Sequence, residues 1–166
     1  MIRRANLGDL DALVQLETQA FDSDRLSRRS FRHLLTRGNA ILLVDAGPDE
    51  LRGYALLRFH ARSDDARLYS LAIHEHHRRQ GAGAALLTAA EAAARAHGAR
   101  RLVLEVREDN HAAARLYERR GFRPFGRYLD FYDDHSDALR LEKPLQHALS
   151  DVTPAFAATP EELYEQ

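Results

Sequence analysis

The stretch from Arg78 to Ala84 has the composition of an anion-binding loop. Gly81 and Gly83 open an alanine-rich, helix-forming segment, and Arg78 and Arg79 precede them. The first N–H groups of a helix have no partner within it, and the helix dipole adds partial positive charge there, so such a start suits a pyrophosphate. Glycine also lets phosphate oxygens approach the backbone. These residues alone leave open a glycine-rich helix start that binds no ligand.

Two familiar phosphate motifs do not fit this loop. A dinucleotide-binding fingerprint needs a third small residue where Leu86 stands, and a P-loop needs a Gly-Lys-Ser/Thr sequence that the chain lacks. Neither motif therefore identifies a ligand, and a glycine-rich helix start that binds none remains an alternative.

Glu105 is a candidate general base, because it is a charged residue within an otherwise apolar predicted strand. Alternation places Leu102, Leu104 and Val106 on one face of that strand and Glu105 on the other. A positioned carboxylate can remove a proton from a reacting group. The alternative is a solvated glutamate, or one paired with Arg101 or Arg107.

Tyr117 is a candidate proton donor, since a phenol with a pKa near about 10 can protonate a leaving group. It follows Asn110 by seven residues, so the cap of a short predicted helix and the phenol lie on one stripe. The alternative is a packing tyrosine next to Leu116 and Phe122.

The run His74-Glu75-His76-His77 resembles a metal-binding sequence only superficially. The HExxH spacing requires a histidine where Arg78 stands, and no nearby acid completes a ligand set. We predict a solvated loop and no metal.

The elements that must position these groups alternate in type, which predicts an α+β fold with a mixed, mostly antiparallel sheet and flanking helices. Asn6 is expected to cap the first helix, whose apolar stripe contains Leu7, Leu10 and Leu13. Ser27 is expected to cap the second helix, and Gly38 is expected to end it. The strand–helix–strand unit in the middle predicts a locally parallel or splayed pair. The predicted order is β-α-α-β-β-β-α-β-α-β-β, with strands at 2–5, 40–44, 51–59, 67–73, 101–107, 122–129 and 138–143.

The composition is that of an ordinary globular domain. The chain has 166 residues, a formal net charge of −1 and no cysteine, which excludes disulfides and thiolate chemistry. We expect one domain at 1–145 and a polar tail or linker at 146–166. A cytoplasmic monomer or homodimer is expected, with no nucleic-acid or membrane partner.

Two motifs in sequence order resemble one enzyme family. Arg78-x-x-Gly81-x-Gly83 after a strand resembles the acyl-CoA motif of the GCN5-related N-acetyltransferase (GNAT) superfamily. The string Leu104-Glu105-Val106-Arg107-x-x-Asn110-x-x-Ala113-x-x-Leu116-Tyr117-Glu118-x-x-Gly121-Phe122 is similar to its bacterial ribosomal-protein alanine N-acetyltransferase branch. The resemblance covers residues 67–143.

The resemblance implies an acyltransferase that uses acetyl-CoA, with Glu105 as general base and Tyr117 as general acid. It further implies that the backbone of Leu71, Ala72 and Ile73 pairs with the pantetheine arm, and that Asn110 hydrogen-bonds the thiol end. The implied pyrophosphate-binding residues are Arg78, Arg79, Gln80, Gly81, Ala82, Gly83 and Ala84.

The acceptor is predicted less directly. Phe21 and the aromatic residues Tyr128, Phe131 and Tyr132 of an acidic connection are expected to line its cleft, but the Tyr-Tyr-Pro element of the alanine-acetyltransferase branch is missing. An α-amine titrates near about 8 and a lysine near about 10.4, so one carboxylate base is better matched to an N-terminal amine. A small-molecule amine or lysine acetyltransferase, and a non-catalytic acyl-CoA-binding module, remain alternatives.

Overall fold

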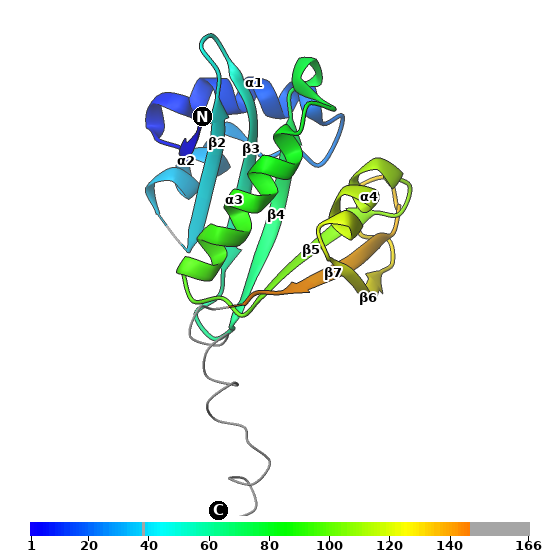
Figure 1. Cartoon of the computed structure of the whole chain (residues 1–166). Coiled ribbons are helices and arrows are strands. Elements are labelled where there is room, and N and C mark those ends of the chain that lie inside the picture. The colour runs from blue at the N-terminus through cyan, green and yellow to red at the C-terminus, as the bar shows by residue number, and fades with distance from the viewer. Residues whose placement is uncertain (38, 147–166) are drawn as a thin grey trace, which may run out of the picture.

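A seven-stranded mixed sheet with helices on both faces forms the body of the protein (Figure 1). The computed structural model describes residues 1–37 and 39–146. The sheet order is β1-β2-β3-β4-β5-β7-β6, and only the β4–β5 pair is parallel. The strands are β1 (Ile2–Arg4), β2 (Ala40–Ala46), β3 (Leu51–Phe59), β4 (Asp65–Ile73), β5 (Arg101–Arg107), β6 (Arg123–Tyr128) and β7 (Ala138–Pro144). The helices are α1 (Leu10–Ala20), α2 (Arg28–Thr36), α3 (Ala82–Ala96) and α4 (His111–Arg119), with short 3-10 turns η1 (Leu7–Asp9) and η2 (Glu75–His77).

This architecture confirms the predicted α+β class and the predicted order of strands and helices. None of the described helices combines the length and apolar character needed to cross a bilayer. The predictions for the segment at 147–166 and for Gly38 concern residues outside the described ranges, and the domain boundary at 145 stays a prediction.

Two apolar cores lie on opposite faces of the sheet. Strand β2 sends Ile41 and Leu43 into the core under α3, and Leu42 and Val44 into the core under α1 and α2. Because both faces are covered, the strand is apolar at consecutive positions rather than at alternate ones.

Helix α3 covers the front face of the sheet in Figure 1. Its side chains Leu86, Leu87, Ala90 and Ala94 are fully buried, and Gly98, with φ +91°, follows its end. The helix therefore presents its N-terminus, the end with free N–H groups, at the upper edge of the sheet.

The first helix begins differently from the prediction. Asn6 caps the 3-10 turn η1, where its side chain accepts a hydrogen bond from Gly8 N and the Asp9 side chain accepts one from Asn6 N. A 3-10 turn has three residues per turn, so it rotates Leu7 off the later α-helical stripe. Leu7 is consequently 55% exposed, whereas Leu10 and Leu13 are buried as predicted.

Strands β4 and β5 separate halfway along their length, which confirms the prediction of a locally parallel or splayed pair. They are paired from Asp65 and Arg101 as far as Leu68 and Leu104. At this point the register of β4 against β3 shifts, because Leu57 pairs with Leu68 and Leu56 with Ser70, which leaves Tyr69 as an extra residue. Such a bulge bends a strand and increases its twist. The bend accounts for the divergence of the two strands.

Candidate active site

The gap between the diverging strands has a free backbone edge on one side. Residues Leu71, Ala72 and Ile73 pair with β3 on their other side, and in the described chain no β5 residue pairs with them. Unpaired N–H and C=O groups on a strand edge can bind an extended ligand as an added strand. This edge fits the predicted partner of a pantetheine arm.

The loop after η2 has two residues in the left-handed region. Gly81 has φ +84° and is the N-cap residue of α3, and Arg79 has φ +64°. Left-handed backbone is uncommon for a residue other than glycine and costs roughly 1–2 kcal/mol. Unusual backbone of this kind concentrates at ligand-binding loops.

The first turn of α3 offers free donors. Its first recorded backbone bond runs from Ala85 N to Gly81 O, at 3.0 Å, and no side chain caps the helix. Within the described chain the N–H groups of Ala82, Gly83 and Ala84 therefore have no backbone acceptor. Three free N–H groups at the positive end of a 15-residue helix suit a pyrophosphate.

Packing against α4 does not by itself require glycine at Gly83. A Cβ at this position would lie 3.4 Å from Leu116 Cδ2 and 3.7 Å from Ile73 Cγ1, which is ordinary van der Waals contact, so its role beside a phosphate stays a prediction. At Gly81 a Cβ would meet nothing within 4 Å, which leaves its positive φ as the reason for glycine.

The polar side chains of the loop make few contacts. Arg78 Nε donates to Ile73 O at 3.1 Å, and Gln80 Nε2 donates to His76 O at 3.4 Å. Asn110 caps α4 by accepting a hydrogen bond from Ala113 N at 3.1 Å, and its amide donors make no recorded hydrogen bond within the described chain. Those donors remain for a ligand near the start of α4.

Glu105 is the first residue of β5 beyond the paired segment, and its side chain is only 7% exposed. Arg67 Nε donates to Glu105 Oε2 at 3.0 Å, and Arg140 Nε lies 4.0 Å from Oε1. The alternative of an arginine-paired glutamate is therefore present, but its partners are Arg67 and Arg140 rather than Arg101 or Arg107.

The partners of Glu105 come from neighbouring strands. Arg140 is directly opposite Glu105 in the antiparallel β5–β7 register, and Arg67 is opposite Val103, on the same face as Glu105. Sequence reasoning missed both arginines because strand register is invisible in the sequence. Arg101 instead pairs with Asp65 and Glu142, and Arg107 pairs with Asp109 and Asp134.

Tyr117 lies on α4 in a buried position, with its ring 5.6 Å from that of Phe122 in an edge-on arrangement. Burial raises the pKa of the phenol well above its usual value, and the nearby phenol of Tyr132 adds to the shift. The packing that the sequence left as an alternative is present, and it keeps the phenol protonated at neutral pH.

Tyr132 interacts electrostatically with both candidate proton-transfer groups, Glu105 and Tyr117. Burial raises its pKa to about 12, and its phenol interacts electrostatically with Arg107, Glu105 and Asp24. The guanidinium of Arg107 also lies over its ring, 4.8 Å from the centroid. The residue predicted to contact the acceptor is therefore within electrostatic range of both Glu105 and Tyr117.

Two loops that are distant in sequence meet beside these groups. The backbone N–H of Asp133, in the β6–β7 loop, donates to Asp24 Oδ1, in the α1–α2 loop, at 3.2 Å. A hydrogen bond between the two carboxyl side chains and the negative charge of Asp24 raise the pKa of Asp133, whereas a hydrogen bond with the Asp24 backbone lowers it. The structure thus brings together the two segments predicted to form the acceptor cleft.

The other predicted acceptor residues are spread over this area. Phe21 is partly buried against the core under α1 and α2. Tyr128 and Phe131 are exposed and stacked, with ring centroids 5.4 Å apart, and Arg140 lies 4.4 Å from the Tyr128 ring centroid. Phe131 also contacts Tyr132 edge-on at 5.0 Å. An aromatic surface therefore extends outward from Tyr132.

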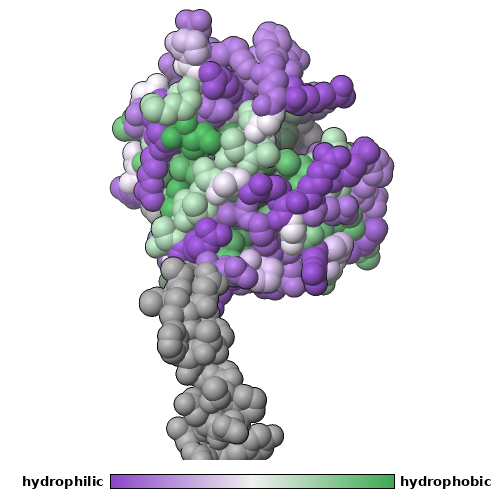
Figure 2. All heavy atoms as spheres, in the orientation of Figure 1, coloured by the Kyte–Doolittle hydropathy of each residue, from purple (hydrophilic) through white to green (hydrophobic). Residues whose placement is uncertain are grey.

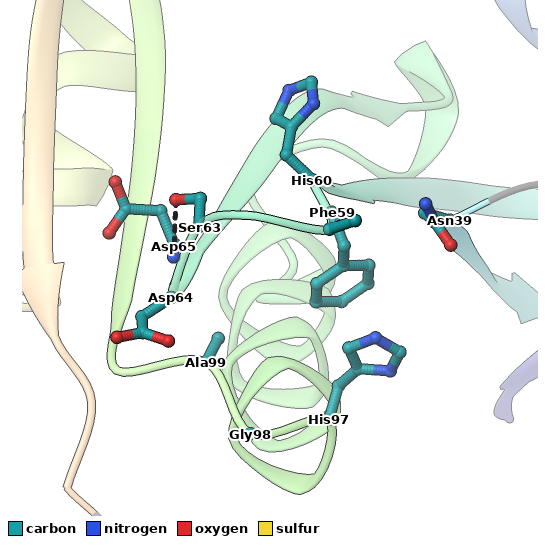
Figure 3. Close-up of a pocket in the computed structure, with 10 residues that line it drawn as sticks. Asn39, Phe59, His60, Ser63, Asp64, Asp65, His97, Gly98 and Ala99 are labelled. Atoms are coloured by element: carbon teal, nitrogen blue, oxygen red, sulfur yellow. Dashed lines mark hydrogen bonds between the residues drawn. The ribbon is translucent and has the colours of Figure 1, made fainter.

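Figure 2, in the orientation of Figure 1, shows polar residues around an apolar patch on the α3 side and a hollow between this side and the α4 side. A separate cavity of about 250 Å³ lies at the opposite end of α3, where Phe59 and His97 stack at 3.9 Å and the β3–β4 turn closes over them (Figure 3). A helix of 15 residues spans about 22 Å, so this cavity is remote from the donor loop.

Comparison with known proteins agrees with this geometry. The Acetyltransferase (GNAT) family model matches residues 10–122. A Bacillus subtilis protein, whose name gives alanine N-acetylation of ribosomal protein bS18 as its expected activity, is 32% identical over 136 residues, which cover 82% of this chain and 89% of that protein. An N-alpha-acetyltransferase of Sulfurisphaera tokodaii is 28% identical over 155 residues, 87% of this chain and 92% of its own.

A solved structure is similar over nearly the whole described chain. The crystal structure of the ribosomal-protein-S18-alanine N-acetyltransferase from Escherichia coli superposes with a TM-score of 0.76 at 28% identity, covering 89% of this chain and 95% of that one.

The chain belongs to the GNAT family of acetyltransferases. It is an N-acetyltransferase, and the family uses acetyl-CoA as acetyl donor.

Proposed function

We propose that the chain acetylates the N-terminal amine of a peptide or protein, with Glu105 as general base and Tyr117 as general acid. The observation that carries the proposal is the position of Glu105. The β4–β5 ladder ends at Leu104, so the carboxylate is the first group of β5 to face the opening between the strands. A thioester held along the free edge of β4 would end beside it.

The two groups are suited to different proton transfers. Glu105, held by Arg67, accepts a proton from the attacking amine, directly or through water. Tyr117 is buried and protonated, so it can donate to the departing thiolate of CoA. The amine nitrogen bonds to the acetyl carbon and the carbon–sulfur bond breaks. The amine proton goes to the Glu105 carboxylate and the phenolic proton to sulfur, and transfer of the Glu105 proton through solvent to the Tyr117 phenolate restores both groups.

The donor site depends mainly on backbone. The free N–H groups at the start of α3 would hold the pyrophosphate. The strand edge at Leu71 to Ile73 would bind the pantetheine arm, and the side-chain amide of Asn110 would bind the thiol end. Arg78 and Arg79 would add positive charge. Phe21, Tyr128, Phe131 and Tyr132 would contact the acceptor.

An N-terminal acceptor is favoured by amine chemistry. At neutral pH the neutral fraction of an α-amine exceeds that of a lysine by more than about a hundredfold. The similar proteins from Bacillus subtilis and Sulfurisphaera tokodaii are both named for N-terminal or alanine acetylation.

The acids of the β6–β7 loop offer little support for capture of a polyamine. Asp134 pairs with Arg107, Asp137 with Arg127, and Asp130 with the ring of His135. The arginines offset the charges of Asp134 and Asp137, so these two carboxylates attract a free cation weakly. Asp133 differs, because it faces the carboxyl of Asp24.

An acceptor panel tests the proposal. Short peptides with free N-termini are set beside the same peptides with blocked N-termini and a free lysine, and beside free polyamines, while CoA release is followed and mass spectrometry locates the acetyl group. We expect turnover only with free N-termini. Turnover of the blocked, lysine-containing peptides or of the polyamines would establish the alternative acceptor class. Binding of acetyl-CoA without turnover would indicate a non-catalytic module.

A further inference from the structure

A carboxylate and two imidazoles meet at the edge of the sheet, between the free edge of β4 and the loop that leads into α3. His77 Nε2 lies 3.0 Å from Glu50 Oε1, and His74 Nε2 lies 3.5 Å from Glu50 Oε2. One ligand atom from each of the three residues lies within 4.8 Å of the others. Glu50 belongs to the β2–β3 turn, His74 precedes η2 as its N-cap residue, and His77 is the last residue of η2. The sequence-based expectation that no acid completes a ligand set at this histidine run is therefore wrong.

We propose that Glu50, His74 and His77 form a binding site for Zn²⁺ or another divalent first-row transition-metal ion. Two imidazole nitrogens and one carboxylate oxygen are a donor set that such ions accept. Ligand atoms at 2.0–2.2 Å from a tetrahedral ion are about 3.3–3.6 Å apart. The separations of 3.0 and 3.5 Å involve different oxygens of Glu50, and one ligand atom from each residue lies within 4.8 Å of the others. Binding therefore requires the three side chains to move toward a common centre.

The backbone holds the ligands in place. His74 N donates to Arg52 O at 2.7 Å, which ties η2 to β3, and His77 N donates to His74 O at 2.8 Å, which fixes the spacing of the two histidines. Preorganisation of this kind reduces the ordering that an incoming ion must impose.

The side chains also leave room for further ligands. Those of His74 and His77 are 16% and 24% exposed, and that of Glu50 is 46% exposed, so water can reach an ion held between them. An ion with three protein ligands and one water is the open arrangement that zinc adopts outside closed structural sites.

One contact opposes binding and limits the affinity. The Nδ1 atom of His74 accepts a hydrogen bond from His76 N at 3.2 Å, so the proton of the neutral imidazole is on Nε2, next to Glu50. Metal binding at Nε2 moves this proton to Nδ1, which breaks the 3.2 Å hydrogen bond from His76 N. Because no carboxylate or carbonyl of the described residues makes a hydrogen bond with His74 Nδ1, we expect an affinity about 10–100-fold below that of a supported site.

His76 is a matched control within the same turn. Its side chain is 71% exposed and its nearest acid is Glu75, at 3.8 Å, so it takes no part in the three-residue set. Its backbone N–H, which contacts His74, is unaffected by a side-chain substitution. The chain has nine histidines, so this control separates a defined site from nonspecific binding.

The test uses the full chain without an affinity tag, freed of metal with a chelator and titrated with ZnCl₂ by calorimetry and by competition with a chromophoric chelator. We expect a single ion per chain. His77→Ala and Glu50→Ala should raise the Kd for Zn²⁺ at least about tenfold, whereas His76→Ala should leave this Kd unchanged. His77→Gln, which can still hydrogen-bond to Glu50, keeps the test valid if the alanine variant is unstable.

Thermal unfolding provides a second measurement. ZnCl₂ should raise the Tm of the wild type and of His76→Ala, and should not raise that of His77→Gln. Absence of binding by the wild type, or an equal loss in His76→Ala and His77→Ala, would overturn the proposal. Neither measurement depends on acetyl transfer.

Discussion

The donor side and the acceptor side of the candidate active site are built in different ways. The donor side consists mostly of backbone groups from one continuous run, Leu71 to Ala84, and the Asn110 side chain at the start of α4 completes it. The acceptor side consists of side chains from separate segments: Arg67 of β4, Glu105 of β5, Tyr117 of α4 and Tyr132 of the β6–β7 loop.

This contrast explains why the donor motif is visible in the sequence and the acceptor site is not. A backbone site needs only the right local conformation, which glycine and a helix start provide over a few residues. A side-chain site needs several elements to be placed relative to one another. Changes on the two sides should therefore have separable effects, on acetyl-CoA binding and on turnover respectively.

The largest expected effect is on the acceptor side. Glu105→Gln keeps the shape of the side chain but removes the base, so kcat/KM for the best peptide acceptor should fall by about 10²–10⁴-fold. Calorimetry should show an unchanged Kd for acetyl-CoA. A full rate in this variant at neutral pH would remove Glu105 from the mechanism.

Tyr117→Phe should lower kcat by about 10²-fold, because the departing thiolate loses its proton donor. In the wild type, the rate should rise as the acceptor α-amine deprotonates near pH 8. Burial raises the pKa of Tyr117, so the phenol keeps its proton above its usual pKa, and no loss of rate from its ionisation should occur below about pH 10. A descending limb between pH 8 and 9 that is absent in Tyr117→Phe would contradict this assignment.

On the donor side, two glycines with positive φ flank α3 and provide a matched pair. An alanine at either Gly81 or Gly98 meets no neighbour within 4 Å, so both substitutions carry the same backbone cost of roughly 1–2 kcal/mol. Only Gly81→Ala should weaken acetyl-CoA binding, by about tenfold, since Gly81 alone lies in the donor loop. Equal Kd values for the two variants would show that the loop does not hold the pyrophosphate.

The smallest effect is expected from the arginines that hold Glu105. Arg67→Met, which removes a 3.0 Å contact, should lower kcat/KM about fivefold, or roughly 1 kcal/mol. Arg140→Met removes a 4.0 Å contact and should cost less. A double variant with Glu105→Gln should show no further loss from Arg67→Met, and an additional loss would mean that Arg67 acts independently of Glu105.

The sequence predicted the elements well where local chemistry defines them. The strand at Arg101–Arg107 has the predicted bounds, and α3 begins one residue after the predicted start at Gly81. The start of the first helix was less accurate, because a capping asparagine such as Asn6 precedes an α-helix and a 3-10 turn alike.

Contacts between distant segments could not be predicted. The pairing of Glu105 with Arg67 joins residues 38 positions apart, and that of His77 with Glu50 joins residues 27 apart. Both depend on which residues face each other after the sheet has formed. The bulge at Tyr69 has no evident signal in the sequence, yet it opens the gap between β4 and β5.

That bulge has a consequence for the stability of the whole protein. It leaves an incomplete seam inside the sheet, and any molecule that fills the seam binds the folded chain but not the unfolded one. At a concentration 100 times its Kd, such a molecule stabilises the fold by about 2.7 kcal/mol. Resistance to heat and proteolysis should therefore follow the supply of acetyl-CoA, so that the metabolite protects the enzyme that consumes it.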